Sequence, residues 1–436
     1  MRRHKRRPPF AIDIDNLSHE GRGVGRINGK TVFVTGALIN EKVIARTVRR
    51  RRSFDEAVVE EVLEASPDRV EPKCRHAGVC GGCTLQHLSA DKQIEHKESV
   101  LFEMLQHHAG IGPRERLPAL RGPQWGYRRK ARLGVKFVQK KGGALVGFRE
   151  KFAPYIADIG ACEVLHPSVG HRLGDLRHLI NSLSISNRIP QIEVAVGDQT
   201  VGLVFRHLAP LSDEDLTLMA KFQQRTGIGI YLQPGAEHTM HALDHDTVEL
   251  SYCVRGIEIK FLPTDFTQIN SDINRAMIEL VMQQLEVHSS DRILDLFCGL
   301  GNFSLPLACN AGYVVGLEGS AELVRRADAN ATGNNIENCT FEVADLADPS
   351  ELLKINMDGI DKLLLDPPRV GADKVVSELD FSAVQRIVYI SCNPVTLARD
   401  CKDIVERHGF VLAAAGVLDM FPHTSHVESI AVFDRH

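Results

Sequence analysis

The second half of the chain carries short, continuously apolar segments separated by helical stretches, and this pattern limits the fold more than any other feature. Four such segments lie at residues 292–297, 313–317, 362–365 and 387–390. Strands without alternating polar residues are typical of a parallel sheet that helices cover on both faces. We therefore predict a doubly wound, Rossmann-like α/β domain over residues 266–436.

A glycine-rich turn follows the first of these strands. Gly299 and Gly301 allow a ligand to approach the backbone, and the helix that follows offers unpaired N–H groups. The second strand ends in Glu318, 23 residues after Asp295, where folds of this class bind ribose hydroxyls. Dinucleotide dehydrogenases share both features, so the turn alone does not identify the cofactor.

The next two strands also end in acids. Asp345 is suited to an adenine amino group, and Asp366 ends the strand after it. This succession resembles the class I S-adenosylmethionine-dependent methyltransferases. The resemblance implies that S-adenosyl-L-methionine, the methyl donor, lies across the carboxyl ends of the strands.

Cys392 directly follows the fourth apolar segment, at the same predicted edge as these acids. A packed cysteine is the common alternative, but the polar turn Ser391-Cys-Asn-Pro394 is no core position. Near the end of the chain, Glu428 precedes a strand expected at 429–433. If that strand runs antiparallel to the others, it begins at the same edge, and Glu428 faces Cys392.

A thiol and a carboxylate in this arrangement suit the methylation of carbon 5 of uracil. That carbon is too weak a nucleophile to take a methyl group, but a thiolate adding to carbon 6 gives it carbanion character. After methyl transfer, a base must remove the hydrogen at carbon 5 so that the thiol can be eliminated. We therefore assign Cys392 as the nucleophile and Glu428 as the base.

Three motifs, Asp366-Pro-Pro-Arg369, Ser391-Cys-Asn-Pro394 and His426-Val-Glu428, resemble those of the RNA uracil-C5 methyltransferase family. The resemblance implies the same two catalytic roles. It also implies residues around the cofactor: Gln268, Phe297, Asn302, Glu318, Asp345 and Asp366. Cytosine-C5 methyltransferases carry their cysteine in a Pro-Cys motif that this sequence lacks, and amino-group methyltransferases have an aromatic residue in place of Arg369.

The N-terminal region contains short β-type runs separated by turn signals, which predicts a small five-stranded barrel over residues 1–68. Composition does not separate an OB-fold from other small barrels. The segments Gly21-Arg-Gly-Val-Gly25, Val32-Phe-Val-Thr-Gly36 and Ser66-Pro-Asp-Arg69 resemble the TRAM domain. That domain is an OB-like, RNA-binding barrel of the uracil-C5 family.

Basic charge is concentrated in two stretches. The whole chain has a net charge of −4, which taken alone disfavours nucleic acid as a partner. Residues 1–52, however, contain 14 Lys and Arg against four acids, and residues 121–151 contain ten against one. Two such stretches predict surfaces for a polyanion such as RNA.

Three cysteines, Cys74, Cys80 and Cys83, stand close together in the sequence, and Cys162 follows later. Four thiolates suit either tetrahedral zinc or an iron–sulfur cluster, and their spacing does not decide between them. A redox pair at Cys80 and Cys83 is a further alternative. The branch of the uracil-C5 family that acts on large-subunit ribosomal RNA carries a [4Fe-4S] cluster on such cysteines, so the resemblance implies this cluster.

The central region, residues 69–265, has mainly β-type patterns and one helix expected at 211–224. A helix near 90–109 is a candidate for packing on the catalytic domain. No apolar stretch approaches the length of a membrane span, and Pro8, Pro9, Asp13 and Asp15 exclude the apolar part of a signal peptide. We therefore expect a cytoplasmic protein with no membrane partner.

These observations predict a multidomain, monomeric enzyme that methylates carbon 5 of one uridine in 23S ribosomal RNA, forming 5-methyluridine. A folded single-stranded or loop region of the RNA is the expected target. A uracil-C5 methyltransferase for tRNA or another RNA is one alternative. The other is a non-catalytic RNA-binding protein with a degenerate cofactor fold.

Overall fold

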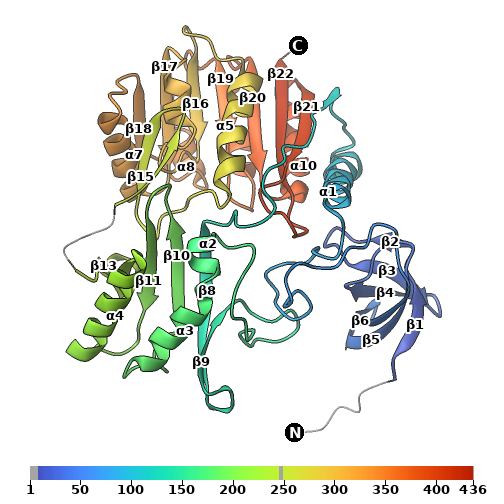
Figure 1. The fold of residues 1–436 in the computed structure, drawn as a ribbon. Helices are drawn as coiled ribbons and strands as arrows, with labels where there is room; N and C mark the ends of the chain where they lie inside the picture. The colour runs from blue at the N-terminus through green and yellow to red at the C-terminus, as the bar shows by residue number, and fades with distance from the viewer. Residues whose placement is uncertain (1–7, 245–248, 436) are drawn as a thin grey trace. The chain divides into compact units, whose positions relative to one another are not determined.

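The computed structural model describes residues 8–244 and 249–435, and the chain divides into two compact units (Figure 1). One unit combines residues 1–100 with the segment Phe421–His426; the other contains residues 101–420 and 427–436. The basic residues predicted within 1–7 lie outside the described part of the chain. Among the described residues, no helix is long and apolar enough to cross a membrane.

The first unit begins with a six-stranded sheet. Its strands are β1 (Phe10–Asp13), β2 (Asn16–Leu17), β3 (Gly23–Ile27), β4 (Lys30–Thr35), β5 (Lys42–Arg50) and β6 (Phe54–Glu64). The order is β1-β5-β6-β4-β3-β2, so β1 and β2 stand at its two ends. Only Ile14 and Asp15 separate them in the chain, and the Asp15 N–H donates to the Val24 carbonyl at 2.9 Å. The sheet therefore closes into a barrel in which β1 and β2 act as one strand.

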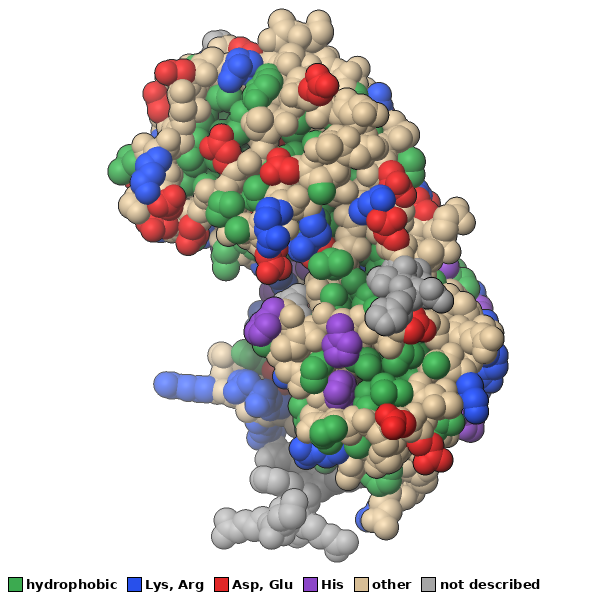
Figure 2. All heavy atoms as spheres, turned by 90° about the vertical axis from the view of Figure 1, so that its left-hand side faces the viewer, with side chains coloured by type: hydrophobic (Ala, Val, Ile, Leu, Met, Phe, Trp, Pro, Cys, Tyr) green, Lys and Arg blue, Asp and Glu red, His purple; other side chains and the backbone are tan. Residues whose placement is uncertain are grey.

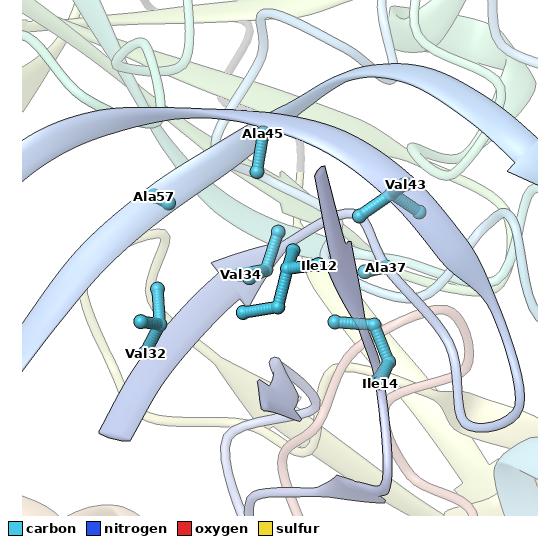
Figure 3. Packing of buried hydrophobic residues seen from close by; sticks show 8 residues of the cluster. All are labelled: Ile12, Ile14, Val32, Val34, Ala37, Val43, Ala45 and Ala57. Atoms are coloured by element: carbon cyan, nitrogen blue, oxygen red, sulfur yellow. The ribbon is translucent and has the colours of Figure 1, made fainter. Parts of the chain in front are cut away.

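Alternating small and branched side chains fill this barrel, because successive residues of a strand point to opposite faces. Figure 3 shows the cluster: Ile12, Ile14, Val32, Val34, Ala37, Val43, Ala45 and Ala57. The first unit continues through a loop into helix α1 (Ala90–Met104). One π-helical turn (Leu105–Ala109) extends the helix, and Gly110, with φ of 69°, ends it.

The barrel carries no net charge over residues 8–64, because nine Lys and Arg face nine Asp and Glu. The basic stretch that the sequence indicated ends at residue 52, whereas the next strand of the same barrel, β6, is rich in acidic residues. Lys30 pairs with Asp55 at 2.6 Å and Arg46 with Glu60 at 2.5 Å. The end of β5 and the turn that follows it still expose four arginines, at positions 49–52.

The second unit contains a six-stranded sheet in the order β13-β12-β11-β10-β8-β9. Its strands are β8 (Lys130–Val138), β9 (Gly143–Gly147), β10 (Gln191–Val196), β11 (Val201–Arg206), β12 (Gly229–Gln233) and β13 (His241–Ala242). Helices α2 (Pro167–Gly170), α3 (Leu173–Ser182) and α4 (Asp213–Thr226) accompany it, followed by a hairpin of β14 (Leu250–Val254) and β15 (Ile257–Phe261). The expectation of one helix was wrong: α3 buries Leu173, Leu176, Leu179 and Ile180 at helical spacing.

An eight-stranded sheet follows, in the order β18-β17-β16-β19-β20-β22-β21-β7. Its strands are β7 (Glu115–Arg116), β16 (Arg292–Leu296), β17 (Tyr313–Glu318), β18 (Cys339–Val343), β19 (Lys362–Leu365), β20 (Arg386–Ser391), β21 (Phe410–Leu418) and β22 (Glu428–Arg435). β16 to β20 are parallel, and β22 is antiparallel to β20. The predicted doubly wound domain and its antiparallel last strand are therefore confirmed.

Helices cover both faces of this sheet (Figure 1). They are α5 (Ser271–Leu285), α6 (Ser304–Ala308), α7 (Ala321–Gly333), α8 (Pro349–Leu352), α9 (Asp373–Glu378) and α10 (Pro394–His408). From β16 the chain continues to β17 and β18 on one side and then to β19 and β20 on the other. Because crossovers between parallel strands are right-handed, the helices of these two sets of connections lie on opposite faces of the sheet. The strand order reverses beside β16, and the carboxyl ends there form the ligand-binding position of such folds.

Candidate active site

Four of the predicted cofactor residues stand at one edge of the eight-stranded sheet. Phe297 follows β16, Glu318 ends β17, and Asp366 follows β19. Asp345 lies two residues beyond the end of β18. Because these strands are parallel neighbours, their carboxyl ends meet at the same edge. The structure thus brings together four side chains that are up to 69 positions apart in the sequence.

The glycine-rich turn after β16 uses left-handed backbone conformations. Phe297, Gly299 and Gly301 have φ angles of 67°, 57° and 85°. The Phe297 N–H donates to the Leu317 carbonyl at 2.9 Å, which ties the turn to β17. A side chain at Gly301 would overlap its neighbours, whereas one at Gly299 would project into open space. A ligand can therefore approach the backbone at Gly299.

Backbone hydrogen bonds fix the carboxylate of Glu318 beside this turn. Its Oε2 accepts from the Gly299 N–H at 3.2 Å, and its Oε1 accepts from the Ser320 N–H at 3.0 Å. Each carboxylate oxygen has two lone pairs. Glu318 can therefore still accept two hydrogen bonds from a ligand such as a ribose.

Asp295, within β16, is fully buried beneath this edge. Its Oδ2 accepts from the Ser304 hydroxyl at 2.5 Å, and its Oδ1 has no hydrogen-bond partner among the described residues. Burial is the main cause that raises the Asp295 pKa to about 7, and the charges of Asp366 and Glu318 add to it. Burial likewise raises the Asp366 pKa to about 7. Three acids this close together favour a cationic ligand, which would stabilise their charged forms.

Asn302 lies just after the turn and is oriented by two side chains from other elements. Its Oδ1 accepts from the Tyr252 hydroxyl and from Asn274 Nδ2, both at 2.9 Å. Its Nδ2 donates to Asn274 Oδ1 at 3.0 Å. Burial raises the pKa of Tyr252 above its ordinary value, so the phenol keeps the proton that it donates. One Nδ2 hydrogen of Asn302 is left for a further acceptor.

A pocket beside this amide network is lined by Gln268, Tyr252, Asn274 and Arg129, among others. Gln268 and the network around Asn302 therefore meet at one pocket. Sequence reasoning did not find Tyr252 or Asn274. A signal existed for Asn274, which lies on the buried face of α5 and is 3% exposed, because a buried amide needs partners.

The pairing of β20 with β22 places Cys392 and Glu428 opposite each other. The last pair of this antiparallel ladder joins Ser391 to Ser429. The next residue along β20 is Cys392, and the residue before Ser429 is Glu428. Opposed residues of an antiparallel pair project to the same side of a sheet. The thiol and the carboxylate therefore share one side of this edge.

Electrostatic effects also connect this pair with Asp366. Burial is the largest cause that raises the Cys392 pKa to about 11; Glu428 and then Asp366 raise it further, and Arg369 lowers it. Burial and the Asp366 charge raise the pKa of Glu428, which is 5% exposed. A carboxylate with a raised pKa is a stronger base than an exposed one. The arrangement places a thiol that stays protonated at neutral pH next to a strong base.

The predicted cluster cysteines fall in both units, with Cys74, Cys80 and Cys83 in the first and Cys162 in the second. All four are partly exposed. Within the part of the chain that the structure describes, no three potential ligands converge closely enough to hold a metal ion. One contact has the chemistry of a thiolate site: the Gly82 N–H donates to Cys80 Sγ at 3.4 Å.

Comparison with known proteins gives consistent results. The model of the tRNA (uracil-5-)-methyltransferase family matches residues 193–436. Two curated relatives, from Alkalilimnicola ehrlichii and Nitrosococcus oceani, are named 23S rRNA (uracil(1939)-C(5))-methyltransferase RlmD. Each is 52% identical to this chain and covers all of it, and the matches span 98% and 99% of the relatives.

A solved structure shows the same fold. The tRNA (uracil-54, C5)-methyltransferase of Pyrococcus abyssi, in complex with S-adenosyl-L-homocysteine, matches with a TM-score of 0.73. The match covers 97% of this chain and 100% of that protein, at 24% identity. By its matching family model and its full-length relatives, the chain belongs to the tRNA (uracil-5-)-methyltransferase family.

Proposed function

We propose that this chain transfers a methyl group from S-adenosyl-L-methionine to carbon 5 of one uridine in 23S ribosomal RNA. The relatives that are named for this reaction align with the whole chain at 52% identity, and this observation carries the proposal. The uridine is the one that corresponds to uracil 1939 in their names. Because ribosomal RNA is the substrate, we place the reaction in the cytoplasm.

The opposed thiol and carboxylate account for the covalent chemistry. Cys392 forms a bond from its sulfur to carbon 6 of the uracil, and carbon 5 gains the electron density needed to take the methyl group. Glu428 then takes the proton from carbon 5. The electron pair of that C–H bond forms the C5–C6 double bond, and Cys392 leaves as a thiolate.

The cofactor edge fits the methyl donor. S-adenosyl-L-methionine, when bound, supplies an electrophilic methyl group. Glu318 would accept from its ribose hydroxyls, and Asp345 from its adenine amino group. Phe297, Gln268 and Asn302 would complete the binding site. The open space at Gly299 and the remaining Asn302 hydrogen support this assignment.

The barrel and the β8–β9 hairpin are the proposed RNA-binding surfaces, the barrel as a TRAM-type domain. The support is local, because the described barrel is neutral overall. Four consecutive exposed arginines, at positions 49–52, lie at the end of β5 and in the turn to β6. On the hairpin, Lys136, Phe137 and Lys140 are exposed, which combines cations with a ring that can stack on a base. On the face of the second unit seen in Figure 2, acidic and basic side chains are interspersed.

A [4Fe-4S] cluster on Cys74, Cys80, Cys83 and Cys162 belongs to this proposal. The thiolate donor set suits it, and the Gly82 N–H that donates to Cys80 Sγ would stabilise a charged sulfur. We assign the cluster a structural role in the RNA-binding part of the protein. This assignment rests on donor chemistry and on the family resemblance.

Labelled methyl transfer tests the function. We expect the protein to place about one methyl group on each 23S RNA taken from cells that lack its gene, because the target uridine is then unmodified. Scintillation counting measures the transfer, and complete nuclease digestion followed by chromatography of the nucleosides identifies the product as 5-methyluridine. RNA from cells that have the gene is the control and should accept almost nothing. Methylation of tRNA in place of 23S RNA would contradict the proposal.

The network around Asn302 gives a second expectation. Asn274→Leu removes both hydrogen bonds between Asn274 and Asn302 and leaves the Tyr252 hydroxyl as the remaining partner of the Asn302 amide, so S-adenosyl-L-methionine should bind about tenfold more weakly. Tyr252→Phe removes one bond and should have a smaller effect. Calorimetric titration measures both.

A matched control lies away from the carboxyl ends of the strands. Asn338, just before β18, donates from Nδ2 to the carbonyls of Ala308 and Ala311 at 2.8 and 3.0 Å. Asn338→Leu should lower the melting temperature without changing cofactor affinity. If Asn274→Leu also changed only the melting temperature, the network would have no part in cofactor binding.

A further inference from the structure

The segment Phe421–His426 connects β21 to β22 and leads directly into the proposed base, Glu428. This segment packs with the first unit of the protein. Four residues of that unit hold its backbone: Thr84, Leu85, Gln93 and Lys97, which we call the clamp. The base is thus two residues beyond a segment that an N-terminal part of the chain holds in place.

Gln93, on α1, is the centre of the clamp and is 4% exposed. Its Oε1 accepts from the His423 N–H at 2.8 Å. Its Nε2 donates to the carbonyls of Leu85 and Leu88 at 3.1 and 2.8 Å. The Gln93 amide therefore links the segment before β22 to the loop at residues 84–89, which follows Cys83.

The rest of the clamp acts on the same segment. The N–H groups of Thr84 and Leu85 both donate to the His423 carbonyl at 2.9 Å. Thr84 Oγ1 accepts from the Ser425 N–H at 2.9 Å, and Lys97 Nζ donates to the Phe421 carbonyl at 3.0 Å.

The clamp holds a backbone that would otherwise relax. His423 has a φ of 65°, in the left-handed region that residues other than glycine uncommonly occupy. Loss of the clamp would release this conformation. The start of β22, two peptide units beyond His426, would then lose a restraint on its N-terminal side.

We propose that Gln93 and Thr84 are positioning residues that keep Glu428 aimed at carbon 5 of the methylated uracil. The proposal rests on the function proposed above. In the step concerned, Glu428 takes the C5 proton, the C–H electron pair forms the C5–C6 bond, and the S–C6 pair leaves with Cys392. Addition of the thiolate and methyl transfer do not use Glu428. A loosened clamp therefore slows only the release of the RNA.

This selectivity gives a test that general destabilisation would not mimic. In Gln93→Met, which keeps the size of the side chain but removes its hydrogen bonds, methylated RNA should stay bonded to Cys392. We expect the fraction of methylated RNA that runs with the protein on a denaturing gel to rise about fivefold over the wild type. Thr84→Val should act in the same direction, and Thr84→Ser, which keeps the hydroxyl, should restore release.

Glu41→Gln is the matched control, because Glu41 is a buried anchor in the same unit that accepts from the Leu38 N–H at 2.7 Å. It should lower the melting temperature without raising the adduct fraction. Release from Gln93→Met at the wild-type rate would overturn the inference. The inference would also be overturned if the Gln93→Met adduct appeared only in protein preparations that had lost iron. In that case the proposed cluster, and not the Gln93 hydrogen bonds, would hold the start of β22. A wild-type protein that methylates no RNA would instead refute the function.

Discussion

Cys392→Ala is expected to abolish RNA methylation, with a loss of at least about 10⁴-fold, because the variant lacks the proposed nucleophile. Carbon 5 of uracil accepts a methyl group only after a nucleophile has added to carbon 6. Cys392, the proposed nucleophile, lies at the end of β20, opposite Glu428. Labelled methyl transfer to unmodified 23S RNA measures the loss.

Two accompanying measurements make this result specific. Cofactor binding to Cys392→Ala should be unchanged in calorimetry, because the predicted cofactor contacts are made by other residues. Cys309→Ala should be fully active, since this exposed cysteine lies after α6, away from the β20–β22 pair. Residual methylation within tenfold of the wild type would rule out the nucleophile assignment.

The high pKa of Cys392 has a consequence for the order of events. With a pKa of about 11, only a small fraction of the free enzyme carries the thiolate at neutral pH. Glu428 and Asp366 raise that pKa and Arg369 lowers it, so the positive charge of Arg369 favours the thiolate form that adds to carbon 6. Because the thiolate is the reactive form, a thiol with such a high pKa reacts slowly with electrophiles in solution. We expect its proton to be lost when the uracil binds.

The catalytic edge followed from the sequence because local patterns determine it. Buried parallel strands have continuous apolar segments, and their carboxyl ends share one edge, so Glu318 and Asp366 were placed correctly relative to each other. The position of Glu428 needed one further assumption, an antiparallel last strand, which the register of β20 and β22 confirms.

Features that depend on distant contacts did not follow from the sequence. Asn274 reaches Asn302 over 28 positions, and Gln93 reaches His423 over 330. Neither residue belongs to a motif, and each acts through an amide whose partner only the tertiary structure supplies. The acids of β6 lie outside the basic stretch of residues 1–52, and the pairing of β4 with β6 brings them into the same sheet.

Glu428→Gln is expected to give the second large effect, a trapped covalent complex. Glutamine keeps the size of the side chain but cannot take a proton from carbon, so the methylated uracil stays bonded to Cys392. We expect a single turnover, with about one RNA per protein molecule resisting denaturation on a gel. Glu406→Gln, on the exposed side of α10, is the control and should release its product.

The dependence of this adduct on pH identifies the base. Burial and Asp366 raise the pKa of Glu428, so its carboxylate form is lost as the pH falls through that raised value. In the wild type, lowering the pH should therefore increase the fraction of methylated RNA that remains bonded to the protein. In Glu428→Gln this fraction should be high at every pH, because the titrating group is gone. A variant whose adduct still responded to pH would show that another residue removes the proton. Rapid release by Glu428→Gln at neutral pH would exclude Glu428 directly.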